Sequence, residues 1–185
     1  FTATALPPAK VAFVVPPSGV VAGAAMSPAV QVAVQDARGN TVAIATDSIT
    51  LTITVGSGTT GATLGRTLTR AAVNGVATFA GLTLDKAGTG YTLTASATGL
   101  TAATSSAFAV TPGTANRLMF TVQPSSVAAG AAIAPAVQVA VQDTLGNTVT
   151  SSTASITLAI TSGTGVAGAT LGGTRTRAAV SGVAT

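Results

Sequence analysis

Two aspartates stand in a motif whose residue types could bind a metal ion. Asp36 and Asp143 each begin the pattern Asp-x-x-Gly-Asn. Calcium prefers six to eight oxygen ligands, usually from several carboxylates, and each motif offers a single carboxylate. Asp and Asn side chains also bind their own backbone in turns, and we favour this interpretation. The alternative is a pair of weak calcium sites with the ligands Asp36, Asn40, Asp143 and Asn147.

Arginine pairs are the second candidate for a site. Arg66 lies close in sequence to Arg70, and Arg175 lies close to Arg177. Such pairs could form a weak site for an anionic glycan or polymer. Charged residues also protect sheet edges against unwanted strand pairing, and we favour that role. The other cations are scattered and no aromatic stacking platform accompanies them, so the formal charge of +4 predicts no nucleic-acid partner.

The residue types that most often carry catalysis are missing. The chain contains no His, Cys, Trp or Glu, and its only acidic residues are four Asp. General acid–base catalysis depends on tuned His, acidic, Lys or thiol groups. Zinc and the softer transition metals prefer Cys or His. We therefore expect no catalytic residue, no cofactor and no metal centre, and predict that the chain is not an enzyme.

The elements that must position these residues occur twice along the chain. Residues 1–78 align without a gap with residues 108–185, and 48 of these 78 pairs are identical. We predict the last strand of a preceding repeat at 1–6, a complete repeat at 7–112 and an incomplete second repeat at 113–185. The joints are short and contain Pro, which favours a semi-stiff array. Because residues 79–111 have no second copy, we expect the natural chain to continue beyond Thr185.

Apolar and polar residues alternate with a period of two, which predicts strands with one buried face. The segments Ala29–Asp36 and Ile49–Val55 show this pattern, and Asn74-Gly75 is a strong hairpin signal. Tyr91 is expected to be a buried strand aromatic or to make a tyrosine-corner-like contact. The predicted fold class is all-β, with tandem immunoglobulin-like antiparallel β-sandwiches of about seven strands per repeat.

The order of short motifs resembles a known family. The pattern V-x-V-x-D-x-x-G-N-x-V occurs at Val32–Val42 and at Val139–Val149. It is followed by GATL, by N/S-G-V-A-T and, in the first repeat, by the segment Gly88–Ala95. This order resembles the bacterial Ig-like domains of invasin- and intimin-type adhesins and related large surface proteins. The resemblance implies an extracellular or cell-surface location, and such domains are often stalk units.

Three hypotheses about function follow. The leading one is a non-enzymatic structural repeat of a long extracellular bacterial surface protein that forms a stalk, fibre or sheath. The alternatives are an adhesin module that binds a host or cell-surface ligand, and a self-assembling filament or surface-layer subunit. The expected partners are neighbouring repeats, copies of the chain itself, and a surface glycan or protein. No membrane span is predicted, because the uncharged stretch between Lys10 and Asp36 contains several Pro and alternates.

Overall fold

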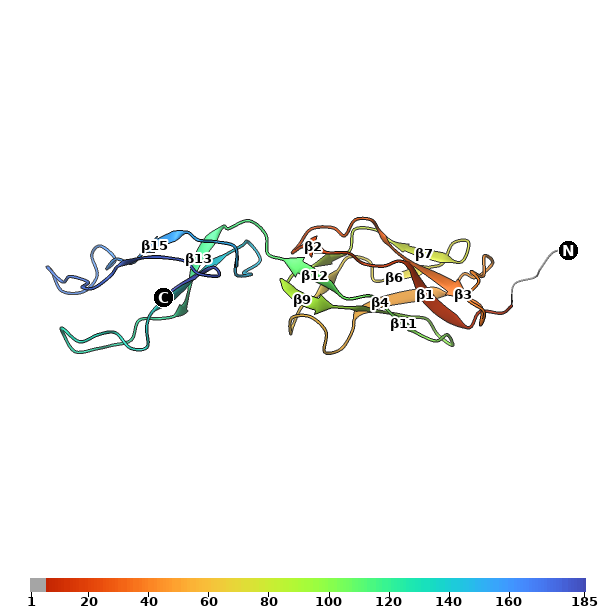
Figure 1. The fold of residues 1–185 in the computed structure, drawn as a ribbon, viewed down its shortest axis with the longest axis horizontal. Coiled ribbons are helices and arrows are strands. Elements are labelled where there is room, and N and C mark those ends of the chain that lie inside the picture. The colour runs from red at the N-terminus through yellow and green to blue at the C-terminus, as the bar shows by residue number, and fades with distance from the viewer. Residues whose placement is uncertain (1–5) are drawn as a thin grey trace. The chain divides into compact units, whose positions relative to one another are not determined.

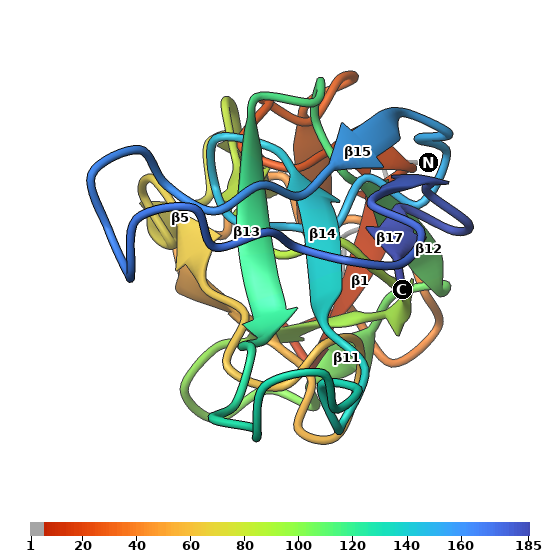
Figure 2. The ribbon, with the colours of Figure 1, turned by 90° about the vertical axis from the view of Figure 1, so that its left-hand side faces the viewer.

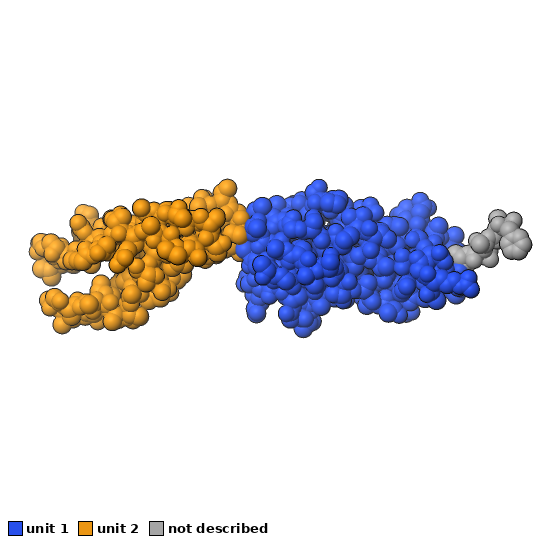
Figure 3. Space-filling view, in the orientation of Figure 1, with its two compact units in different colours: residues 1–111 blue, residues 112–185 orange. Residues whose placement is uncertain are grey.

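Strands make up all the regular structure in the computed structural model, which describes residues 6–185. The predicted all-β class is therefore confirmed. The chain divides into two units, unit 1 (Phe1–Thr111) and unit 2 (Pro112–Thr185), which Figure 3 shows in different colours. The strand predicted at 1–6 lies outside the described residues except for Leu6. No helix that could cross a membrane is found within residues 6–185.

The first sheet of unit 1 is antiparallel and has the order β1-β3-β7 (Figure 1). Its strands are β1 (Lys10–Val15), β3 (Val30–Gln35) and β7 (Val76–Phe79). The valines of β3 are fully buried, as their alternation predicts. β1 lies at the edge of the sheet and ends before Pro16-Pro17, because proline has no N–H to donate to a ladder.

The second sheet is also antiparallel, with the order β11-β10-β4-β6. Its strands are β11 (Ala103–Thr104), β10 (Leu93–Ser96), β4 (Ser48–Ile53) and β6 (Thr69–Ala71). Leu and Ile side chains of one face are buried. On the opposite face, Thr hydroxyls bond each other across neighbouring strands, as between Thr50 and Thr69 at 2.9 Å. This sheet therefore has one apolar and one polar face.

A third set of strands contains one parallel pair. β2 (Val20–Val21) pairs in parallel with β12 (Phe108–Thr111), which pairs antiparallel with β9 (Gly88–Tyr91). The chain leaves the first sheet at Pro16-Pro17 and joins β12 instead of continuing beside β3. The remaining pair is β5 (Leu64–Gly65) with β8 (Thr83–Leu84). Residues 6–111 form twelve short strands, because longer strands are interrupted, as between β9 and β10.

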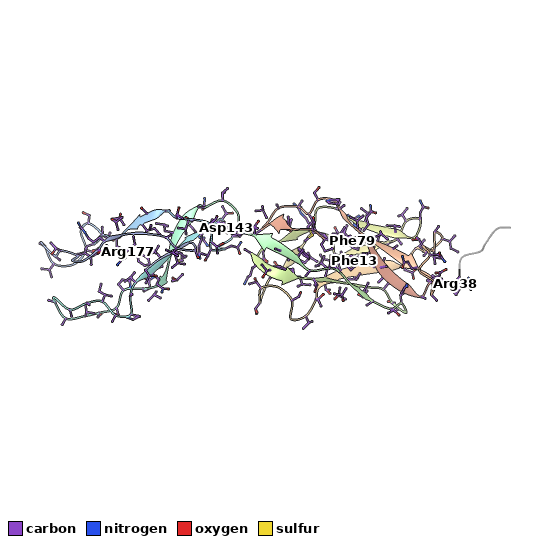
Figure 4. All side chains as sticks on the ribbon, in the orientation of Figure 1. Phe13, Arg38, Phe79, Asp143 and Arg177 are labelled. Carbon is purple, nitrogen blue, oxygen red and sulfur yellow. The ribbon has the colours of Figure 1, made fainter. Side chains whose placement is uncertain are left out.

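Side chains from these sheets form one core, which makes unit 1 a β-sandwich. Phe79 and Tyr91 are the largest fully buried side chains (Figure 4 labels Phe79). The Tyr91 ring lies 5.9 Å from the Phe108 ring, and its hydroxyl donates to the carbonyl of Lys86 at 2.8 Å. A buried Tyr bonded to backbone a few residues upstream is typical of immunoglobulin-like sandwiches.

Unit 2 contains strands that correspond to those of unit 1 at an offset of 107 residues. β13 (Arg117–Val122), β14 (Gln138–Gln142) and β17 (Val183–Ala184) form one antiparallel sheet, and Figure 2 shows β13 beside β14. β15 (Ser155–Thr157) pairs with β16 (Thr176–Ala178). The β13–β14 register repeats that of β1–β3, including an irregularity at the equivalent position. Residues 79–111, which carry β8 to β12, have no counterpart in unit 2.

Candidate functional site

The turn that follows β3 brings Asp36 and Asn40 together. Asp36 is only 1% exposed. Its Oδ1 accepts from the backbone N–H groups of Arg38 and Asn40, both at 2.9 Å. Its Oδ2 accepts from Nδ2 of Asn40 at 3.1 Å. The carboxylate thus closes the turn, and Gly39 provides the positive φ of 90° that the turn requires.

Asp143 makes the same turn after β14. It is also 1% exposed, and its Oδ1 accepts from the N–H groups of Leu145 at 2.9 Å and Asn147 at 2.8 Å. Nδ2 of Asn147 donates to Oδ2 at 3.0 Å. Gly146 has a φ of 87°. Asp143 is labelled in Figure 4.

A further donor reaches each carboxylate from far away in the sequence. Oδ2 of Asp143 accepts from the N–H of Gly113 at 2.8 Å, across 30 residues. The backbone of Leu6, the equivalent residue of unit 1, hydrogen-bonds Asp36. Leu6 and Gly113 occupy equivalent positions of the repeated sequence. Sequence analysis missed this contact; the signal available was the constant spacing between each Asp and the joint before it.

Hydrogen bonding keeps both carboxylates ionised. The Asn40 side chain is the main cause that lowers the pKa of Asp36, and backbone donors add to it against the effect of burial. For Asp143, burial is the largest single influence and raises the pKa, but the bonds from Asn147, Gly113 and Leu145 together lower it. Each site therefore stabilises a buried negative charge through N–H donors.

These donors bear on the calcium alternative. An oxygen that accepts an N–H bond directs that lone pair toward hydrogen, whereas a cation needs the lone pair for itself. The two predicted pairs, Asp36 with Asn40 and Asp143 with Asn147, lie in different units. Within residues 6–185, no three His, Cys, Asp or Glu residues come together as a metal-binding group. The arrangement is that of a carboxylate-capped turn.

The arginine candidates differ between the units. Arg66 follows β5, is exposed, and has a φ of 81°, whereas its counterpart Gly173 has a φ of 82°. A side chain is strained in this region, so unit 1 carries Arg where the backbone favours Gly. Arg70 lies in β6 opposite Ile49 and is exposed.

Arg175 and Arg177 line a hollow of about 280 Å³ in unit 2, together with Ile156. A second hollow of about 650 Å³ includes Arg175 and Leu158 in its lining. Figure 4 labels Arg177. The equivalents of Ile156 and Leu158 in unit 1 are fully buried, whereas in unit 2 Ile156 is buried and Leu158 is half-buried.

Hydrogen bonds hold the loop between β4 and β5 in unit 1. Asp85 accepts from both the N–H and the hydroxyl of Thr63, each at 2.7 Å. Thr59 donates its hydroxyl to the carbonyl of Ala87 at 2.7 Å. Gly58 lies so close to the Tyr91 ring that a Cβ there would overlap it. Loop 54–63 is thereby fixed to the strands that carry Tyr91.

No protein-family model matches the chain, and no curated protein matches it. The resemblance to bacterial Ig-like adhesin domains therefore stays a prediction that rests on the order of sequence motifs.

Proposed function

We propose that this chain is a non-enzymatic structural repeat of a long extracellular bacterial surface protein, in which tandem β-sandwiches form a stalk, fibre or sheath. The observation that supports it is the duplicated strand pairing. Val11 pairs with Val34 in unit 1, and Leu118 pairs with Val141 at the equivalent register in unit 2. Repetition of one structural unit with a short joint would extend a chain by a fixed step.

The composition supports the same proposal. Only 6% of the residues are charged, and polar surface is supplied largely by Thr hydroxyls such as those of Thr50 and Thr69. The fold contains no Cys, so no repeat depends on the redox state of its surroundings. Such a unit can be copied many times without building up a large electrostatic charge and without forming a mispaired disulfide.

The test is removal of one repeat length from the native gene. Deleting residues 7–113, which preserves the repeat phase of 107 residues, should shorten the surface projection by one step and leave it on the cell. Electron microscopy of labelled cells measures projection length, and antibody binding to intact cells measures location. Loss of a catalytic activity without a change in length would overturn the proposal, as would an antigen found only inside the cell.

An adhesin role is the second candidate, and exposed apolar loop residues favour it. Ile44 is 89% exposed and Val55 is 100% exposed, and their counterparts are Ser151 and Ser162. These apolar side chains distinguish two loops of unit 1 from the matching loops of unit 2, as a ligand-specific surface would require. Replacing Ile44 and Val55 with Ser should abolish adhesion of bacteria to host cells if these loops bind, and should leave it unchanged if the unit is a spacer.

A further inference from the structure

The joint between the units has few free backbone angles, because hydrogen bonds anchor the chain on both sides of one proline. The carbonyl of Thr111 accepts from the N–H of Ala22 at 2.8 Å, within unit 1. The N–H of Gly113 donates to Asp143 at 2.8 Å, within unit 2. Pro112 alone separates the two anchored residues.

The peptide groups on either side of Pro112 are planar, so only φ and ψ of this residue can change between the anchors. The pyrrolidine ring fixes φ near −65°. The ψ angle of Pro112 is then the single soft dihedral in the joint. Its preceding residue, Thr111, is also restricted to extended conformations and is held in β12.

The anchor on the unit 2 side depends on one side chain. Without the bond to Asp143, the next backbone anchor is the N–H of Asn116, which donates to the carbonyl of Gln142 at 2.8 Å. Gly113, Thr114 and Ala115 would then add six φ and ψ angles, two for each residue. One of the three is Gly, which has the widest conformational range.

We propose that Asp143 is a joint clamp, a buried carboxylate that limits motion between successive units by holding Gly113, the second residue of its own unit. In unit 1, Asp36 has the equivalent backbone hydrogen bond from Leu6. The clamp follows from chain geometry and holds whether the array is a spacer or an adhesin. Its failure and that of the proposed function are therefore separate results.

The experiment measures distances between spin labels in the whole chain. The sequence has no native Cys, so Ser48→Cys and Ser155→Cys place one label on an exposed strand residue of each unit. We compare the parent, Asp143→Asn and the matched control Asp36→Asn by pulsed electron resonance. Asn keeps one accepting oxygen for the local turn but presents N–H₂ toward the joint.

We expect a narrow distance distribution for the parent, a clearly broader one for Asp143→Asn, and the parent width for Asp36→Asn. Equal widths for the parent and Asp143→Asn would overturn the clamp, as would equal broadening by Asp36→Asn. A second label pair, Thr121→Cys with Ser155→Cys, lies within unit 2 and reports whether that unit stays folded.

If Asp143→Asn unfolds unit 2, hydrogen exchange in the unsubstituted chain tests whether Asp143 holds the Gly113 amide. The Gly113 amide should exchange about tenfold or more slowly than the adjacent Thr114 amide, relative to their unstructured rates, because a bond to a charged acceptor is strong. Exchange of Gly113 at the Thr114 level would refute the clamp.

Discussion

Some equivalent positions of the two units share their strand pairing but differ in burial. Val11 is 2% exposed in unit 1, whereas its counterpart Leu118 is 56% exposed in unit 2. Both pair with a Val of the neighbouring strand in the same register. Local sequence therefore determines the pairing, whereas the burial of a strand also depends on the opposite sheet, which in unit 1 includes β10 and β11.

The largest difference in stability between the two units is expected when an equivalent core leucine is truncated in each. Leu51→Ala should lower the free energy of unfolding of unit 1 by about 2–5 kcal/mol, because Leu51 is fully buried. Leu158→Ala, at the equivalent half-buried position, should cost about 1 kcal/mol, in proportion to the smaller area buried. Denaturant unfolding followed by Tyr91 fluorescence reports unit 1, since the chain has one Tyr and no Trp. Hydrogen exchange reports unit 2, and equal losses would contradict the comparison.

A pair of glycines isolates the contribution of Tyr91. Gly58 and Gly165 have φ of 65° and 73°, so Ala at either site should cost about 1–2 kcal/mol in backbone strain. Only at Gly58 would the new Cβ overlap the Tyr91 ring, which adds about 1–3 kcal/mol of overpacking. A Cβ at Gly165 meets nothing within 4 Å. Equal destabilisation in the two variants would exclude the ring contact.

Acid should weaken both units, and unit 1 more strongly. Asp85 also has a lowered pKa, since the bonds from Thr63 outweigh the opposing effect of burial. Because folded carboxylates of low pKa take up protons later than unfolded ones, their stabilisation is complete well above the ordinary aspartate pKa of about 3.9 and is lost as pH falls below about 4. Unit 1 contains two carboxylates with a lowered pKa, Asp36 and Asp85, whereas unit 2 contains one, Asp143.

Thermal unfolding from pH 7 to pH 2 measures this effect. The melting temperature should change little down to about pH 5 and then fall. Asp85→Asn should reduce the size of the fall in unit 1 while lowering stability at pH 7. A melting temperature that rises below pH 4 would contradict the prediction that protonation of these carboxylates destabilises the fold.

The smallest effect concerns the strained arginine. Arg66→Gly should stabilise unit 1 by about 0.5–1 kcal/mol, since relief of about 1–2 kcal/mol of strain exceeds the greater flexibility that Gly gives to the unfolded chain. The reverse change, Gly173→Arg, should destabilise unit 2 by a similar amount. Chemical denaturation measures both, and loss of stability in Arg66→Gly would mean that the Arg66 side chain makes a stabilising contact.

Local signals in the sequence predicted local structure well. The Asn74-Gly75 hairpin is present, with φ of 50° and 76°, and hydrogen bonds of 2.9 and 3.1 Å join Val73 and Val76. The Asp-x-x-Gly-Asn turns also form as carboxylate-capped turns. Such features depend on residues within about five positions of each other, so the residue types at those positions suffice to specify them.

Features that join distant segments were not predictable in the same way. The parallel pairing of β2 with β12 joins residues about 90 positions apart, and alternation carries no information about strand partners. The positive φ of Arg66 could not be predicted from the residue type either, because Arg rarely adopts this conformation. Only its Gly counterpart, Gly173, gave a signal.

By itself, the sequence determined the duplication, the strand faces and the turns, because each follows from residue types at short, fixed spacings. The tertiary structure decided which strands face each other, and therefore why Val11 is buried while Leu118 is exposed. It also decided that Asp143 reaches Gly113 across 30 residues. Burial and long-range hydrogen bonds depend on how separate segments meet in space, and no short pattern in the chain records that.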